Sequence, residues 1–155
     1  MVYLIDNKNI NEARKQINKF SGREIIALIA RDDEFNRKML ETGKINILVF
    51  SELLERKDRL KQRDSGLNQV LCKIAGDNNV AVGIDFKQIA KLKEFELSSY
   101  LAKIMQNIKL CRKYQVKIVI INIHGADLID LKSFLLTLGM PTDMAKYAVE
   151  NSVEI

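Results

Sequence analysis

The chain has 155 residues, of which 47% are hydrophobic and 29% charged, with one Pro, seven Gly and no Trp. This composition predicts a single globular domain over residues 1–155 and excludes low-complexity disorder and collagen-like sequence. The 25 basic and 20 acidic residues give a formal net charge of +5. No apolar run is long enough to span a membrane, and the first residues lack the pattern of a signal peptide. We therefore expect a cytoplasmic protein with no membrane partner.

The sequence offers few side chains for a metal site. His124 is the only histidine, and the two cysteines, Cys72 and Cys111, are far apart in the sequence. Multi-histidine sites and zinc sites built from paired cysteines are therefore excluded within one chain. Each cysteine lies among apolar residues at helical spacing, which predicts a small buried hydrophobe. We expect no metal and no cofactor in this chain.

Five β-branched runs alternate with helical patterns along the chain. They are continuous apolar stretches, as expected for strands that are covered on both faces. The predicted strands are Val2–Ile5, Glu24–Ala30, Ile45–Phe50, Val80–Phe86 and Val116–Ile123. Gly83 lies inside the fourth run, where a small residue allows close packing.

The segments between these runs carry apolar residues at three- and four-residue spacing. One helix follows the turn Asp64-Ser65-Gly66, and we predict that Asp64 or Ser65 is its N-cap. A longer helix includes Ile104 and Ile108 on its apolar side, with Lys103 elsewhere on its circumference. A last helix, Thr142–Val149, follows Pro141.

Regular alternation of strands and helices predicts an α/β fold with a parallel sheet, because parallel neighbours need crossover helices. No Gly-rich phosphate fingerprint follows the first strand, so the sequence does not indicate nucleotide binding. Five strands are too few for a closed eight-stranded barrel. The pattern alone predicts either a partial barrel or a small open sheet.

The positive charge is uneven along the chain. Residues 118–155 contain two basic and five acidic residues, whereas residues 1–117 contain 23 basic and 15 acidic residues. One cluster, residues 56–63, has five basic residues and one acid in a predicted mobile connection before a helix. A second cluster, residues 103–117, has no acid. Either cluster can contact the phosphates of RNA or another polyanion, or can form a solvated surface.

Two polar residues lie at predicted carboxyl ends of strands, where α/β barrels carry their chemistry. Asp85 ends the fourth strand and His124 directly follows the fifth. They can form an acid–base pair or part of a metal site. Alternatively, Asp85 only accepts backbone hydrogen bonds, and His124 caps the following helix or faces solvent. Without further histidines or clustered carboxylates the signal is weak. We therefore predict no catalytic residue in this chain.

The stretch Arg63-Asp64-Ser65-Gly66-Leu67-Asn68-Gln69-Val70-Leu71, followed by Asn79-Val80-Ala81-Val82-Gly83, resembles the ribonuclease P protein component 3 family. This family is the thirty-kilodalton subunit of archaeal and eukaryotic ribonuclease P. Supporting matches are Asn36-Arg37-Lys38, Lys113-Tyr114, Leu138-Gly139-Met140 and Ala145-Lys146. The similarity covers essentially all of this chain but only part of the family.

The resemblance implies a partial TIM-like barrel related to the PHP phosphoesterases. Val2–Ile5 is similar to the third strand of the family's barrel, so the first two strand–helix units are expected to be missing. Gln69 stands where many members have His. An open barrel leaves an unpaired strand edge, and we expect this chain alone to self-associate or to depend on its complex.

The resemblance also implies a non-catalytic role in removing the 5′ leader from precursor tRNA. The catalyst is the RNA subunit with Mg²⁺, and the protein partner is a small RRM-like subunit. The expected RNA contacts are Arg37, Lys38, Arg56, Lys57, Arg59, Lys61, Arg63, Asn68, Lys113 and Lys146, with Asp64, Ser65 and Gly66 as a structural cap. Asn68 can equally hydrogen-bond its own loop. The alternatives are a PHP-like metal-dependent phosphoesterase, which the single histidine disfavours, and a free-standing RNA-binding scaffold.

Overall fold

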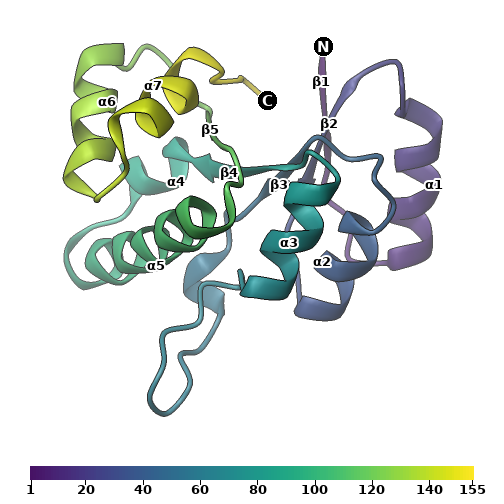
Figure 1. The fold of residues 1–155 in the computed structure, drawn as a ribbon, viewed down its shortest axis with the longest axis horizontal. Coiled ribbons are helices and arrows are strands. Elements are labelled where there is room, and N and C mark those ends of the chain that lie inside the picture. The colour runs from purple at the N-terminus through teal and green to yellow at the C-terminus, as the bar shows by residue number, and fades with distance from the viewer.

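A computed structural model describes residues 1–155 as strands and helices in alternation (Figure 1). The strands are β1 Val2–Ile5, β2 Ile25–Ile29, β3 Ile47–Val49, β4 Ala81–Asp85 and β5 Ile118–Ile121. The helices are α1 Ile10–Phe20, α2 Asp33–Leu40, α3 Gln69–Asp77, α4 Phe86–Lys91, α5 Glu94–Tyr114, α6 Leu128–Thr137 and α7 Thr142–Glu150, with a 3-10 turn, η1, at Leu53–Glu55. All five predicted strands are confirmed, most of them slightly shorter than predicted.

The five strands form one parallel sheet in the order β1-β2-β3-β4-β5. Each new strand is added on the same side of the previous one, and the order never reverses as it does in a doubly wound sheet. This winding is that of a barrel. The predicted α/β class is confirmed, and the strand order favours the partial barrel over a small open sheet.

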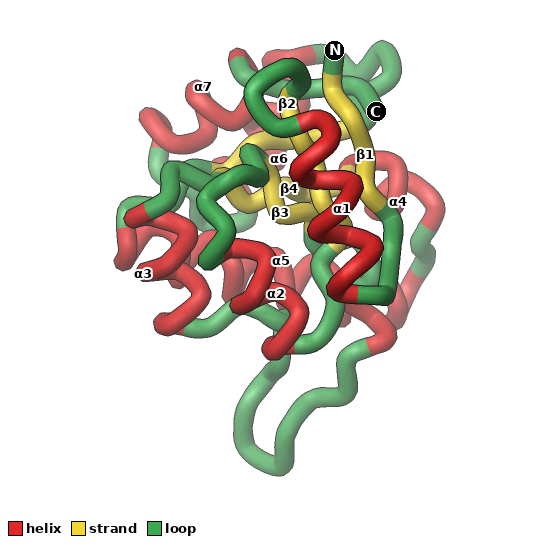
Figure 2. The backbone as a smooth tube through the Cα atoms, turned by 90° about the vertical axis from the view of Figure 1, so that its right-hand side faces the viewer, coloured by secondary structure: helices red, strands yellow, loops and turns green.

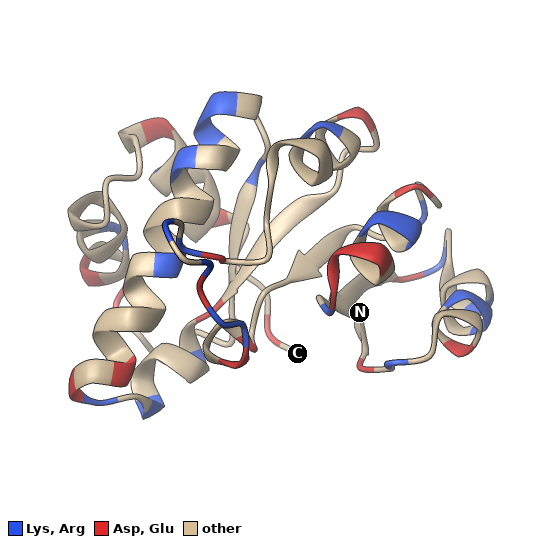
Figure 3. Cartoon of the chain, turned by 90° about the horizontal axis from the view of Figure 1, so that it is seen from below, with Lys and Arg blue, Asp and Glu red and all other residues tan.

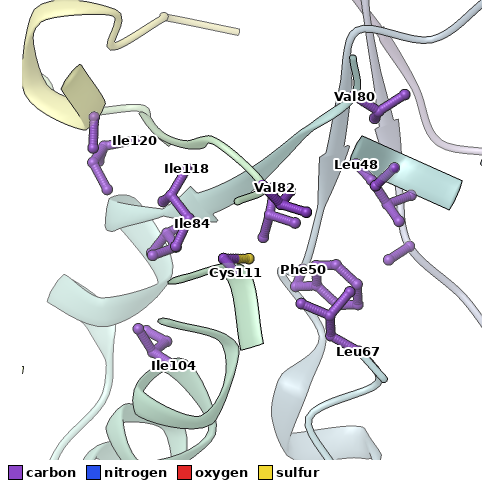
Figure 4. Packing of buried hydrophobic residues seen from close by; sticks show 14 of the residues in the cluster. Leu48, Phe50, Leu67, Val80, Val82, Ile84, Ile104, Cys111, Ile118 and Ile120 are labelled. Atoms are coloured by element: carbon purple, nitrogen blue, oxygen red, sulfur yellow. The ribbon is translucent and has the colours of Figure 1, made fainter. Parts of the chain in front are cut away.

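The main core lies between the sheet and the helices that cover one of its faces. In Figure 2, α1, α2 and α3 lie in front of the strands. Figure 4 shows side chains from both layers meeting there, among them Val82 and Ile118 from the sheet and Ile104 and Cys111 from α5. A smaller cluster on the opposite face is formed by Ala27, Ile29, Ile47, Val49, Ala81, Val119 and Ile121. Because both faces are buried, the strands appear as continuous apolar runs in the sequence.

The barrel is open beside β1. This strand pairs only with β2, and Leu4 and Ile25 remain 39% and 44% exposed. At the other end of the sheet, the carboxyl-terminal segment pairs with β5 through a parallel bridge between Val153 and Ile121. The sheet therefore has a free edge at β1, and the edge at β5 is paired only near its carboxyl end.

The glycine inside β4 is there for packing, as predicted. A Cβ at Gly83 would lie 2.9 Å from Cγ2 of Ile47 and 3.1 Å from Cγ2 of Val49. Those methyl groups belong to the neighbouring strand, so any larger residue would push β3 and β4 apart.

The two cysteines lie together, although they are far apart in the sequence. Cys72 in α3 and Cys111 in α5 are both fully buried. A hydrogen bond with Cys72, together with burial, raises the pKa of the Cys111 thiol well above its ordinary value. The predicted buried state is confirmed, but the sequence did not reveal that the cysteines touch where α3 packs on α5. No helix of the structure combines the length and the apolar character needed to cross a membrane.

Candidate nucleic-acid interface

The basic cluster of residues 56–63, hereafter the basic loop, projects from the body of the protein below α3 and α5 (Figure 1). Its tip is a tight turn in which the amide of Arg59 donates to the carbonyl of Gln62 at 2.8 Å. Lys57, Lys61 and the longer side chains of Arg59 and Arg63 are exposed to solvent. Figure 3, which views the molecule from below, shows basic residues along the loop in blue. Arg59 lies 3.6 Å from Asp64 and Arg63 lies 4.0 Å from Asp58, whereas Lys57 and Lys61 have no ion-pair partner. The loop therefore presents four exposed basic side chains, two of them in ion pairs within the loop and the turn that follows it.

The loop is anchored at its start by a buried lysine of α5. The ammonium of Lys103 donates to the carbonyl of Leu53 at 2.9 Å and to the carbonyl of Arg56, and it lies 3.5 Å from the carboxylate of Asp58. Its side chain is only 3% exposed. The sequence placed Lys103 away from the apolar side of α5, whereas the structure buries it. An ammonium can be buried here because two carbonyls and a carboxylate replace its water.

A second residue of α5 holds the end of the loop. The side-chain amide of Gln106 donates to the carbonyl of Arg63 at 2.9 Å, and its oxygen accepts from the amide of Ser65 at 3.2 Å. Lys103 and Gln106 are three residues apart and therefore lie on the same side of the helix. One face of α5 thus fixes both ends of the basic loop.

Arg56 connects the loop to α2 instead of facing solvent. Its guanidinium lies 2.7 Å from Asp33 and 3.1 Å from Asp64, and it donates to the carbonyl of Arg31 at 3.1 Å. Burial alone would raise the pKa of Asp64, but the amide of Gly66 and the Arg56 guanidinium lower it. Arg56 was predicted as an RNA contact, and the structure gives it this role within the fold.

The prediction that Asp64 or Ser65 is the N-cap of α3 is wrong. Helix α3 begins at Gln69, and its N-cap is Asn68, whose side-chain oxygen accepts from the amides of Val70 and Leu71. Asp64 instead accepts from the amide of Gly66 at 2.9 Å and stabilises the turn before the helix. The side-chain oxygen of Ser65 is buried and has no hydrogen-bond partner. Asn68 was expected to hydrogen-bond either RNA or its own loop, and the structure gives it a local role as the N-cap of α3.

A groove of about 370 Å³ lies between the basic loop, the start of α3 and the end of α5. It brings together four of the predicted RNA contacts, Arg59, Arg63, Asn68 and Lys113. We call it the loop–helix groove. The sequence did not predict its polar neighbours Gln62, Gln69, Gln106 and Tyr114, because they come from three separate segments.

Aromatic and amide groups at one end of the groove are already ordered. The Tyr114 hydroxyl donates to the side-chain oxygen of Gln69 at 3.2 Å, and the Lys113 ammonium lies 5.4 Å from the centre of the Tyr114 ring. Gln69 therefore makes a specific contact with α5 at this end of the groove. Asp33 and Asp64 also line the groove, and Arg56 pairs with both. The groove offers cations for phosphates together with an aromatic ring and amides for nucleotides.

The remaining predicted contacts lie elsewhere. Arg37 and Lys38 on α2 form ion pairs with Glu41 and Glu34, one turn away on the same helix. Lys146 on α7 lies 3.8 Å from Glu150. None of the three lines the loop–helix groove.

The carboxyl ends of the strands carry an internal ion-pair network. Arg31, after β2, pairs with Asp6 after β1 and with Glu52 after β3, and its side chain is 9% exposed. Because one guanidinium already serves both carboxylates, this edge does not resemble an open cluster of metal ligands. No group of three or more His, Cys, Asp or Glu side chains is placed to hold a metal ion.

The two residues considered for catalysis are separate. Asp85 is buried and caps α4, accepting from the amide of Lys87 at 3.1 Å and from Asn122 at 3.3 Å. His124 is 60% exposed and pairs with Glu154 at 3.0 Å. Each side chain therefore has the structural role that the sequence left open as the alternative.

Comparison with known proteins agrees with the fold and with the motifs. Ribonuclease P protein component 3 of Methanococcus maripaludis is 31% identical over 159 residues, covering 97% of this chain and 64% of that protein. Its counterpart in Methanocaldococcus jannaschii is 28% identical over 157 residues, with the same coverage. A chain in the cryo-EM structure of archaeal ribonuclease P with mature tRNA has a TM-score of 0.77 and 27% identity over 96% of this chain and 64% of that one. The chain is a homologue of ribonuclease P protein component 3.

The predicted resemblance is thus confirmed, although no protein-family model matches the chain. This component 3 homologue spans 64% of the length of the Methanococcus relative. Its predicted RNA contacts stay predictions, since neither the relatives nor the fold tests them.

Proposed function

We propose that this component 3 homologue is a protein subunit of ribonuclease P that binds the RNA subunit and supports removal of the 5′ leader from precursor tRNA. The observation that carries the proposal is the loop–helix groove, where a loop fixed by α5 and the end of α5 itself bring cations together. The identity with component 3 proteins and the likeness to a chain of archaeal ribonuclease P support the choice of RNA.

The groove suits a structured RNA because its cations are held apart at defined positions. Arg59, Arg63 and Lys113 can each neutralise a phosphate, which releases counterions and makes binding depend on salt. A loop fixed at both ends loses less conformational freedom on binding than a free basic tail would. The surface therefore favours a particular backbone geometry over unspecific polyanion binding.

The other expected partners follow from the same role. A small RRM-like protein subunit is expected to pair with this chain, and precursor tRNA is reached indirectly through the RNA. The chain contributes no catalytic residue, and Mg²⁺ serves the RNA subunit. The internal pairing of Arg31 gives no support to a PHP-like metal-dependent phosphoesterase.

A reconstitution assay tests the proposal. Ribonuclease P RNA and the small protein subunit from the same source are combined, and precursor-tRNA cleavage is followed against Mg²⁺ with and without this chain. We expect the chain to lower the Mg²⁺ that is needed. Replacing Lys57, Arg59, Lys61 and Arg63 by Ala should remove most of this effect.

A matched variant controls for net charge. Arg14, Lys19, Arg23 and Lys91 are exposed on α1, the following connection and α4, away from the groove, and replacing them by Ala removes the same charge. This control should keep the effect on Mg²⁺. Cleavage that is indifferent to the wild-type chain at every salt concentration would contradict the proposal and would favour a free-standing RNA-binding scaffold.

A further inference from the structure

A second cavity lies beside the carboxyl end of α5, where the start of β5 meets α7. It has a volume of about 630 Å³, within the range of about 300–1,000 Å³ that is usual for small-molecule sites. Its apolar part includes Cys111, Val116, Ile118 and Met144, and it shares no residue with the loop–helix groove. We call it the α5–α7 pocket.

The charged side chains of the pocket come from the second basic cluster of the sequence and from α7. Arg112 and Lys117 line the pocket, are exposed and have no ion-pair partner. Asp143 at the start of α7 is the one acid that lines the pocket, and the other charges of α7, Lys146 and Glu150, pair with each other at 3.8 Å. Because its cations outnumber its acids, the pocket suits a ligand that joins an apolar part to an anion.

An aromatic ring also lines the pocket. The Lys117 ammonium lies 5.1 Å from the centre of the Tyr147 ring, and Tyr147 is only partly buried. The loop–helix groove has the same arrangement, with the Lys113 ammonium 5.4 Å from the centre of the Tyr114 ring. An exposed lysine moves readily between rotamers, so a base can take its place on the ring while the ammonium meets a phosphate.

Gln115 lines the pocket from a strained backbone position. It follows the last turn of α5 with φ +57° and ψ 34°, in the left-handed region where glycine is usual after a helix. A side chain costs conformational energy there, and residues held in such strain are concentrated at functional sites. The amide of Gln115 is exposed and can both donate and accept, as the edge of a base requires.

We propose that the α5–α7 pocket receives one unpaired nucleotide of the RNA that the loop–helix groove binds. The base stacks on Tyr147 and meets the amide of Gln115, and its phosphate lies near Arg112 and Lys117. The inference rests on the proposed function and adds to it a second site, which contacts a base. The two sites are continuous, because Arg112 lines the pocket and its neighbour Lys113 lines the groove.

Other occupants fit the pocket less well. A base within a duplex is stacked between its neighbours and cannot reach a ring inside a cavity, so the nucleotide must be unpaired. An apolar segment of a protein would bury both cations without partners, which costs free energy. A free inorganic anion would leave the ring and the apolar part of the pocket exposed to water.

Ultraviolet crosslinking identifies the occupant directly. Ribonuclease P RNA is bound to the chain, irradiated and digested with trypsin and ribonuclease, and the crosslinked peptides are identified by mass spectrometry. Cleavage after Lys146 gives the peptide 147–155, in which Tyr147 is the only aromatic residue. We expect this peptide among the crosslinked products, whereas a fully paired RNA duplex should not give it.

Three side chains of the pocket are then tested by the affinity for ribonuclease P RNA. Tyr147→Leu should weaken binding about 10-fold, as expected for the loss of one stacked base, whereas Tyr147→Phe should keep the affinity. Gln115→Gly should raise the urea midpoint, because glycine relieves the strained backbone, and yet weaken binding about 3- to 10-fold. Lys117→Gln should weaken binding about 5-fold near 0.1 M salt, as expected for one phosphate contact. Lys109→Gln is the matched control, because this exposed lysine of α5 lines neither site, and it should bind within about twofold of wild type.

The pocket and the proposed function can fail separately. If wild type binds the RNA without crosslinking to peptide 147–155, and Gln115→Gly binds as tightly as wild type, the pocket is not a nucleotide site while the proposed function stands. Gln115→Gly decides this even if Tyr147→Leu does not fold, because the glycine stabilises the chain. If wild type does not bind the RNA, the proposed function fails. A free mononucleotide that binds the pocket more tightly than the RNA does would assign the site to a soluble nucleotide and overturn the proposal.

Discussion

Replacing Lys103 by Met should release the basic loop without unfolding the protein. Methionine keeps an unbranched apolar chain of similar length, so the packing of the stem along α5 is retained. The change removes the donor to the carbonyls of Leu53 and Arg56 and the ion pair with Asp58. A hydrogen bond from a charged group contributes about 1.5–3 kcal/mol, so the start of the loop loses about 3 kcal/mol of anchoring.

The loss of about 3 kcal/mol lowers the free energy needed to open the loop locally, and it is not a loss of global stability. Gln106 and Arg56 still hold other points of the loop, so the core keeps its packing. A loss of about 3 kcal/mol raises the open fraction roughly 100-fold, because each 1.4 kcal/mol is a factor of ten. The loop should then open far more often while the rest of the chain stays folded.

The rate of tryptic cleavage measures how often the loop opens, because the loop itself contains cleavage sites at Lys57, Arg59 and Lys61. Cleavage should be much faster in Lys103→Met than in wild type, with the cut positions identified by mass spectrometry. Lys109→Met is the matched control, since it removes an exposed lysine of the same helix. If the two variants are cleaved at equal rates, the buried lysine does not anchor the loop.

Three further predictions concern the ends of the loop. Gly66→Ala should lower stability by about 1–2 kcal/mol in urea unfolding and speed tryptic cleavage of the loop, because Gly66 has φ +82° and a Cβ there would lie 3.0 Å from Cδ of Arg56; an unchanged urea midpoint would contradict this. Asn68→Ala should cost about 1 kcal/mol, the usual contribution of an N-cap, whereas Asn68→Asp should keep that stability in the same measurement. The pKa values of Asp58 and Asp64 are lowered, the first mainly by the amide of Asp64 and the second by Gly66 and Arg56 against the effect of burial. Their stabilisation is therefore complete above the ordinary aspartate value of about 3.9 and is lost as the pH falls through the lowered values, so NMR signals of the Asp64 and Gly66 amides should shift only below about pH 4; a transition near pH 6 would refute this.

The strands could be predicted from the sequence because a strand that is buried on both faces has apolar residues at consecutive positions. Residues such as Ile118 and Val119 face opposite sides of the sheet, yet both are buried, so the run is apolar without alternation. Parallel pairing then follows from the helices between the runs. The strand order needed the structure, since no local pattern specifies which strands are neighbours, and the free edge of β1 was expected only from the resemblance.

The architecture of the interface could be predicted only in part. The basic loop is visible in the sequence as a run of charges, but its anchors Lys103 and Gln106 lie more than forty residues further along the chain. A lysine on a helix is usually exposed, so nothing local indicated that Lys103 is buried. Asp64 and Asn68 are both good N-cap residues within one short turn, and only the course of the backbone decides between them.

The central claim is that the basic loop and the loop–helix groove bind ribonuclease P RNA, and the salt dependence of that binding tests it most directly. The dissociation constant for the RNA is measured over a range of salt concentrations for wild type and for the variant with Lys57, Arg59, Lys61 and Arg63 replaced by Ala. We predict that the slope of log K against log salt is smaller in magnitude by about 3 in the variant, because each lost phosphate contact removes roughly 0.7–0.9. The control that replaces Arg14, Lys19, Arg23 and Lys91 should keep the wild-type slope. A slope that is equal in all three proteins would contradict the account.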